Sequence, residues 1–225
     1  MKLEKNPMSM RLYFQNINGL STQNLSENWI DILYLMETNQ VDMYGLAETN
    51  ITWNPTIKNI LFYKLRQHVS SNKNSVKLVS ASCDDPTHGI YQPGGVCQVT
   101  VGKVAGRAGM SGSDPHGLGR WTYITLQGKE GRKVVVVTLY RLAQASQPLG
   151  HRTAYNQQFR LLRRQGKKKP LPKKQVCEDL LIQIKQWEKD SEIIIMVDAN
   201  SSLHDPQWAS FLNKARLYDL LGNKH

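Results

Sequence analysis

Residues 193–200, IIIMVDAN, decide the fold because an unbroken apolar run passes directly into a polar cluster. A short apolar run of this composition predicts a strand that is covered on both faces. Asp198 and Asn200 stand where the strand ends, so we expect their side chains on one rim of a sheet. Residues of this kind often only form turns, and for this cluster alone the two interpretations are equally good.

Two earlier strands end in the same manner. Residues 10–16 (MRLYFQN) predict a strand that leads into residues 16–19, Asn-Ile-Asn-Gly, and residues 41–47 (VDMYGLA) predict a strand that ends at Glu48. Turn formation alone explains three such clusters poorly, because each follows an apolar strand. Carboxylates such as Glu48 and Asp198 are hard oxygen ligands that suit Mg²⁺. The lack of a His or Cys cluster with ligand spacing argues against zinc.

The rest of the chain alternates between strand and helix patterns. Residues 24–40 are predicted as a helix, because Asn24 and Glu27 have the spacing of a capping box and apolar residues follow at helical spacing. Asp205 and Pro206 predict the start of a last helix that ends near residue 215. The other predicted strands cover residues 95–101, 121–126 and 134–140, and the other predicted helices cover residues 153–165 and 174–189. We expect loops around one or two short elements in residues 50–93, and a glycine-rich loop in residues 102–119.

This pattern, strands first and then helices mixed with strands, predicts an α/β fold. We expect a four-layer α/β sandwich, in which two mainly antiparallel sheets pack face to face with helices outside. A length of 225 residues suits one domain that spans residues 1–225 and can bury a substantial core. A basic helix–loop insert is expected at about residues 151–175.

Positive charge is concentrated in one segment. Residues 160–174 contain eight basic side chains and no acidic one, and so carry eight of the eleven net charges of the chain. Such a patch attracts a polyanion, and we interpret it as a nucleic-acid contact. A solvated linker or a nuclear-import signal has a similar composition. The residues assigned to the contact are Arg163, Arg164, Lys167, Lys168 and Lys169.

The cellular setting is predicted from what the sequence lacks. Cys83, Cys97 and Cys177 fit neither a disulfide framework nor a zinc site, which favours a reducing, intracellular setting, nuclear or cytoplasmic. No apolar run approaches the roughly 18 residues of a membrane span. The first ten residues lack the apolar segment of a secretory signal. We therefore expect no membrane partner.

Five short motifs, in this order along the chain, resemble those of the endonuclease/exonuclease/phosphatase superfamily, which includes apurinic endonucleases and pancreatic deoxyribonuclease. The resemblance extends from Arg11 to about Leu221. Residues 117–121 (GLGRW) and the helical insert after Tyr140 are most similar to the retrotransposon-type endonuclease domains of this superfamily. The five motifs are Asn16-Ile17-Asn18-Gly19, the strand that ends at Glu48, Gly94-Gly95-Val96, Val137-Thr138-Leu139-Tyr140-Arg141 and Val197-Asp198-Ala199-Asn200.

The sequence departs from the family pattern in two places. Val197 stands where the family has Gly before its Asp-x-Asn motif. The family pattern also ends with a further strand and a Ser-Asp-His motif, and neither occurs here. We expect a C-terminally truncated domain, and we assign the catalytic histidine to neither His204 nor His225.

The resemblance implies a role for each matching residue. Glu48 would ligate Mg²⁺, with Mn²⁺ as a substitute, and Asn16 would lie in the same site. Asp198 would orient or deprotonate the attacking water, Asn200 would position water or phosphate, and Tyr140 would contact the phosphate or the leaving oxygen. For Arg120 and Arg141 we expect either contacts to the substrate backbone or exposed positions on the rim.

The implied function is a Mg²⁺-dependent phosphodiesterase, in particular a DNA endonuclease of mobile-element type, with impaired activity in this chain. A parent of that type would carry a reverse transcriptase downstream. Two alternatives stay open. One is a catalytically inactive fragment that binds nucleic acid, and the other is a phosphatase of the same fold that acts on a small phosphate ester.

Overall fold

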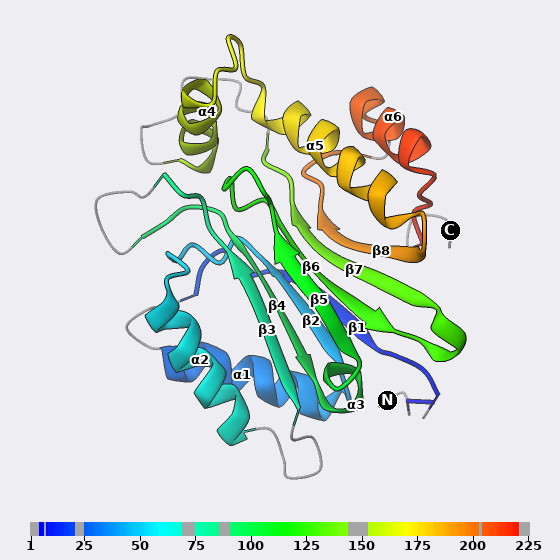
Figure 1. Ribbon diagram of the computed structural model, residues 1–225. Helices are drawn as coiled ribbons and strands as arrows, with labels where there is room; N and C mark the ends of the chain where they lie inside the picture. The colour runs from blue at the N-terminus through cyan, green and yellow to red at the C-terminus, as the bar shows by residue number, and fades with distance from the viewer. Residues whose placement is uncertain are drawn as a thin grey trace.

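The computed structural model describes residues 5–6, 8–20, 25–68, 75–85, 91–143, 153–202 and 204–220. These residues form two four-stranded sheets with helices around them (Figure 1). One sheet has the order β1-β2-β4-β3, with β1 (Leu12–Asn16), β2 (Met43–Ala47), β3 (Val76–Ala81) and β4 (Val96–Val101). The other has the order β5-β6-β7-β8, with β5 (Ala108–Ser113), β6 (Trp121–Gln127), β7 (Lys133–Tyr140) and β8 (Ser191–Asp198).

Each sheet is mainly antiparallel but contains one parallel pair. In the first sheet β1 runs parallel to β2, with Asn16 opposite Ala47. In the second sheet β7 runs parallel to β8, with Tyr140 opposite Asp198. Across the interface between the sheets, β1 contacts β8 and β2 contacts β7. The two parallel pairs therefore face each other in the middle of the molecule.

Helices form the two outer layers, so the predicted four-layer α/β sandwich is confirmed (Figure 1). On one side α1 (Leu25–Thr38) and α2 (Pro55–His68) cover the β1–β4 sheet, and on the other α5 (Pro172–Trp187) and α6 (Pro206–Ala215) cover the β5–β8 sheet. The remaining helical elements are α3 (Gly102–Ala105), the short 3₁₀ turn η2 (Lys129–Gly131) and α4 (Ala154–Arg164). None of the helices in the described ranges is both long and apolar enough to cross a membrane.

Alternating side chains of the central strands fill separate cores. Tyr44 and Leu46 of β2 pack beneath α1 and α2, whereas Met43 points between the sheets. In β7, Val135 and Val137 pack beneath α5 and α6, and Val136 points between the sheets. Both faces of these strands are covered, which explains their nearly continuous apolar sequences.

The two sheets lie close together at Gly45 of β2. A Cβ atom there would lie 2.7 Å from Thr138 Oγ1 and 2.8 Å from Met196 Cε, both in the opposite sheet. A side chain at this position would therefore hold the sheets apart. Buried Gln98 of β4 also joins the sheets, because its Nε2 donates to the Val136 carbonyl at 3.3 Å.

Two segments that were predicted as mostly loop contain regular elements. Residues 50–93 include the 14-residue helix α2, whose buried Leu61 and Leu65 are one turn apart. Of the Asn, Ser and Asp residues that suggested loops in this segment, helix α2 contains only the exposed Asn59. Residues 102–119 include β5, where Gly112 leaves room for the Tyr123 ring, which would lie 2.8 Å from a Cβ atom. Pairing with β6 supplies the strand structure that glycine-rich sequence does not predict.

Helix boundaries agree with the predictions to within a few residues. Thr153 caps α4 by accepting a hydrogen bond from the Asn156 backbone N–H at 3.3 Å. Asp205 caps α6 as predicted, since its carboxylate accepts from the backbone N–H groups of Gln207 and Trp208. Helix α5 begins at Pro172, two residues before its predicted start. The capping box predicted at Asn24 lies outside the described residues.

Candidate active site

The carboxyl ends of β1, β2, β7 and β8 meet at one rim of the sandwich. Asn16, at the end of β1, donates from Nδ2 to Asp198 Oδ2 at 2.6 Å, across the gap between the sheets. Beside this pair, Tyr140 at the end of β7 forms a side-chain hydrogen bond with Glu48, which follows β2. The structure therefore brings together four of the side chains that were predicted as catalytic or metal-binding residues.

The backbone at this rim is in a conformation that most residues avoid. Asn18, Glu48, Asn50 and Asn200 have φ angles of 46°, 52°, 54° and 44°, in the left-handed region. Asn tolerates this region better than other non-glycine residues, but for Glu48 it costs about 1 kcal/mol or more. Backbone strain of this kind is concentrated at functional sites, where the surroundings must hold it in place.

Asn50 holds the Glu48 turn, although the sequence did not single it out as a functional residue. Its side-chain Oδ1 accepts from the Gly94 backbone N–H at 2.7 Å, and its own backbone N–H donates to the Gly94 carbonyl at 2.8 Å. A Cβ atom on Gly94 would lie 3.7 Å from the Tyr140 ring, so the turn and the ring are held against each other. The signal available in the sequence was an Asn two residues after the candidate metal ligand.

Tyr140 is held as a neutral hydrogen-bond donor. Its side chain is buried, and desolvation raises the pKa of the phenol far above its ordinary value. The hydrogen bond to Glu48 and the negative charges of Glu48 and Asp198 raise the pKa further. Tyr140 therefore keeps its proton at neutral pH and can offer it to Glu48 or to a substrate oxygen.

Asp198 is fixed in place by two donors. Oδ2 accepts from Asn16, and Oδ1 accepts from the Asn200 backbone N–H at 3.2 Å. Asn16 is fixed in turn, because its Oδ1 accepts from the Asn18 backbone N–H at 3.0 Å. Asn200 donates from its Nδ2 to the Arg141 carbonyl at 2.9 Å. These contacts orient the carboxylate before any substrate arrives, as a general base requires.

The donor atoms at this rim fit a hard divalent cation such as Mg²⁺. The carboxylates of Glu48 and Asp198 and the side-chain oxygen of Asn16 are oxygen ligands, and Glu48 is only half-buried. Across the described ranges, no three His, Cys, Asp or Glu side chains form a group that could hold a metal by themselves. The oxygen donors at the rim suit Mg²⁺, which usually keeps several waters and takes one or two carboxylates plus a substrate phosphate.

Arg120 does not reach the surface, which corrects both interpretations that the sequence suggested for it. It is 1% exposed, and its guanidinium forms ion pairs with Asp114 at 2.5 Å and with Asp179 at 2.9 Å. The guanidinium also lies over the Trp121 ring, 4.7 Å from its centroid. This arrangement joins β6 to α5 inside the protein, so Arg120 is neither a substrate contact nor a rim charge.

Arg141 is corrected in the same way. It is fully buried, and its guanidinium donates to residues of the loop that follows β8 and to the starts of α5 and α6. Charge alone predicted surface positions for Arg120 and Arg141, because the sequence did not show the acceptors that satisfy each guanidinium inside the fold.

The basic segment lies at the end of α4 and in the loop before α5. Arg163 and Arg164 close α4, and Arg164 pairs with Asp85 at 2.6 Å, so part of its charge is already balanced. Lys167, Lys168 and Lys169 are exposed. For these residues the predicted contact with nucleic acid stays a prediction.

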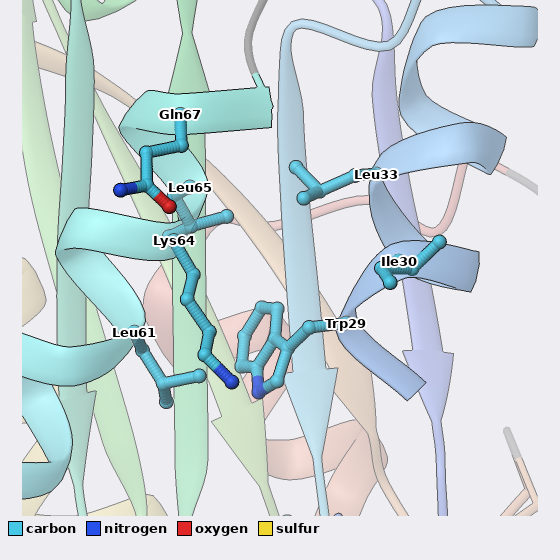
Figure 2. Close-up of a pocket in the computed structure, with 7 residues that line it drawn as sticks. All are labelled: Trp29, Ile30, Leu33, Leu61, Lys64, Leu65 and Gln67. Atoms are coloured by element: carbon cyan, nitrogen blue, oxygen red, sulfur yellow. The ribbon is translucent and has the colours of Figure 1, made fainter. Parts of the chain in front are cut away.

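A separate pocket lies between α1 and α2, in the outer layer of the β1–β4 side (Figure 2). It contains none of the residues that converge at the strand ends. Apolar side chains line most of it, and Lys64 and Gln67 supply its polar groups. The lining residues are Trp29, Ile30, Leu33, Leu61, Lys64, Leu65 and Gln67.

No protein-family profile matches the sequence, and no curated protein matches it. Solved structures do match the fold. An AP endonuclease from Archaeoglobus fulgidus superposes with a TM-score of 0.56 at 12% identity, over 92% of this chain and 70% of that chain. A 3′ phosphatase, NExo, from Neisseria bound to a product DNA hairpin superposes with a TM-score of 0.54 at 13% identity, over 92% of this chain and 71% of that chain.

A third solved structure with a matching fold is named after the endonuclease/exonuclease/phosphatase family. An endonuclease/exonuclease/phosphatase family protein from Leptotrichia buccalis superposes with a TM-score of 0.51 at 12% identity, over 92% of this chain and 73% of that chain. Identities this low establish a common fold and no more. This chain therefore has the fold of the endonuclease/exonuclease/phosphatase proteins.

Proposed function

We propose that this chain hydrolyses phosphodiester bonds in nucleic acid, with Mg²⁺ or Mn²⁺ held by Glu48 and Asn16. One observation carries the proposal, namely the meeting of the Asn16–Asp198 and Glu48–Tyr140 pairs where four strands end. These are the residue types that metal-assisted hydrolysis of a phosphate ester requires, and they come from four separate parts of the sequence.

Each residue has a role in this reaction. The bound cation would supply Lewis-acid stabilisation of charge on the phosphate. Asp198, already oriented by Asn16 and by the Asn200 backbone, accepts a proton from the attacking water. Asn200 positions that water or a phosphate oxygen. Tyr140, held in its protonated form, donates a hydrogen bond to a phosphate oxygen or to the leaving oxygen.

The proposal extends to the substrate and the parent protein. Double-stranded DNA is the proposed substrate and a mobile element the proposed source, with a reverse transcriptase domain in the parent chain. Exposed Lys167, Lys168 and Lys169 support a contact with a phosphate backbone beside the site. One intracellular domain over residues 1–225, with the basic insert at about residues 151–175, belongs to the same proposal.

The second candidate function is a module that binds nucleic acid without cutting it. The exposed lysines of the basic segment, Lys167, Lys168 and Lys169, favour this candidate, because they can contact a phosphate backbone without any catalytic step.

A labelled DNA duplex separates these candidates from each other and from a phosphatase that acts on small esters. Binding and cleavage are measured in parallel with Mg²⁺ and with EDTA, beside phosphate release from an inositol phosphate. The proposal predicts Mg²⁺-dependent cleavage of the duplex. Binding that persists in EDTA without any cleavage supports the binding module, and phosphate release from the small ester alone supports the phosphatase.

A further inference from the structure

Arg141 follows Tyr140 directly and bonds to four consecutive residues, namely the last residue of β8 and the first three of the loop after it. Its backbone N–H donates to the Asp198 carbonyl at 2.9 Å, and its own carbonyl accepts from Asn200 Nδ2 at 2.9 Å. Its Nη1 donates to the Ala199 carbonyl at 3.1 Å and also to Ser201 Oγ. One residue, directly after β7, therefore holds the segment that carries Asp198 and Asn200.

The rest of the guanidinium is fixed by the two helices behind this loop. Nε donates to the Lys173 carbonyl at 3.2 Å, at the start of α5. Nη2 donates to Gln207 Oε1 at 2.7 Å, and the guanidinium lies over the Trp208 ring, 5.3 Å from its centroid, at the start of α6. A planar guanidinium with five donors can serve all these acceptors at once, whereas an ammonium group cannot.

The same contacts determine which atoms of Asn200 stay available. Asn200 has a φ angle of 44°, which must be held from outside. Its carbonyl accepts from Lys173 Nζ at 2.9 Å, and its Nδ2 is engaged by the Arg141 carbonyl. Its backbone N–H is engaged by Asp198 Oδ1. None of these contacts involves the side-chain Oδ1 of Asn200, so this atom stays available.

We propose that Arg141 is a positioning residue that holds Asp198 and Asn200 in their working geometry without touching the substrate. The proposal rests on the proposed hydrolytic function, because it assigns Arg141 its role through those two residues. A displacement of about 1 Å in such a loop commonly lowers the rate about a hundredfold. The full burial of Arg141 excludes the direct contact with substrate that its charge suggested.

Arg120 provides a matched control. It is also a buried arginine over a tryptophan ring, but its ion pairs are with Asp114 and Asp179 and not with the loop after β8. Lysine at either position keeps the charge and loses the planar set of donors. Arg141→Lys and Arg120→Lys therefore both lower the melting temperature, and only Arg141→Lys is expected to disturb Asp198 and Asn200.

Two measurements test the inference. In Mg²⁺-dependent DNA cleavage, Arg141→Lys should lower kcat at least about tenfold with KM changed less than about threefold, while Arg120→Lys leaves both unchanged. In amide hydrogen exchange followed by NMR, the Asn200 backbone N–H should exchange at least about tenfold faster in Arg141→Lys and at the wild-type rate in Arg120→Lys. Equal effects of the two substitutions in both measurements would show a purely structural role and overturn the inference.

The two measurements separate this inference from the proposed function. If the wild-type chain cleaves nothing, the proposed function fails, and hydrogen exchange at Asn200 still decides whether Arg141 positions the loop. If Arg141→Lys does not fold, Gln207→Leu replaces it, because that change removes one acceptor that holds the guanidinium. It should then give the same loss of kcat and the same faster exchange at Asn200, and wild-type values in Gln207→Leu would overturn the inference.

Discussion

Replacement of Gly45 by alanine tests whether packing between the sheets sets the geometry of the site. A Cβ atom at position 45 would lie 2.7 Å from Thr138 Oγ1, 2.8 Å from Met196 Cε and 3.2 Å from Phe14 Cδ2. All three distances are shorter than ordinary van der Waals contact. Thr138 lies on β7, Met196 on β8 and Phe14 on β1. Each of the three contacted residues precedes a site residue by two positions. Thr138 precedes Tyr140, Met196 precedes Asp198, and Phe14 precedes Asn16.

The expected cost follows from this crowding. Insertion of a methyl group into a packed core costs about 1–3 kcal/mol. For a chain of this size each kcal/mol lowers Tm by roughly 2–4 °C, so Gly45→Ala should lower Tm by roughly 2–12 °C. The Asn16–Asp198 hydrogen bond should lengthen as the sheets separate, and DNA cleavage should slow by more than the loss of folded protein explains.

Circular dichroism melting and cleavage rates measured below the transition provide the assay. Gly106→Ala is the control, because Gly106 has an ordinary helical φ of −64° and its Cβ atom would meet nothing closer than 3.5 Å. That change should be neutral or stabilise by up to about 1 kcal/mol. A Gly45→Ala chain with the wild-type Tm and the wild-type cleavage rate would refute the close approach of the sheets at this position.

Three further outcomes are expected. Asn16→Ala removes the donor to Asp198 Oδ2 and should lower kcat at least about tenfold with little change in Tm, as measured by cleavage kinetics and melting. The pKa of Tyr140 is raised on folding, so its contribution to stability is complete below pH ~10 and is lost as the pH rises further. Tyr140→Phe should therefore flatten the fall of Tm above pH ~10. The double change Lys168→Glu, Lys169→Glu should flatten the salt dependence of DNA binding, in a plot of log K against log salt, by about two units or more.

Each of these outcomes has a control. Asn39→Ala removes an exposed amide that donates to the Leu35 carbonyl, away from the site, and should leave kcat unchanged. Tyr63→Phe removes an exposed phenol and should leave the fall of Tm at high pH as it is in the wild type. Lys103→Glu together with Lys129→Glu changes the net charge equally outside the basic segment. A salt slope that falls equally in both double variants would refute a local contact at Lys168 and Lys169.

The sequence predicts most of the fold because the central strands are locally unambiguous. An apolar run such as residues 193–197 has to be covered on both faces, and the polar residues that follow it then lie on a rim. The same argument places Glu48 and Asn16 at the ends of their strands. Helix α2 and strand β5 were missed because burial and pairing with distant residues stabilise them, and local sequence does not show those contacts.

The sequence indicated which side chains meet at the candidate site, but not which residues hold them in place. Asp198 and Glu48 follow apolar strands, which marked them from the sequence. Arg141 was misplaced at the surface, because acceptors separated from it by 32 to 66 residues determine its burial. Asn50 was not assigned a role for the same reason, since its partner Gly94 is 44 residues away.

Nicking of supercoiled plasmid by the purified chain tests the central claim most directly. Wild type, Asp198→Asn and Asp190→Asn are compared with Mg²⁺ and with EDTA. Asp190→Asn is the matched control, because Asp190 is an exposed carboxylate that directly precedes β8 and pairs with Lys133. We predict Mg²⁺-dependent nicking that Asp190→Asn retains and Asp198→Asn loses. A folded wild-type chain that does not nick, or equal nicking by all three chains, would contradict the assignment of a hydrolytic site to these strand ends.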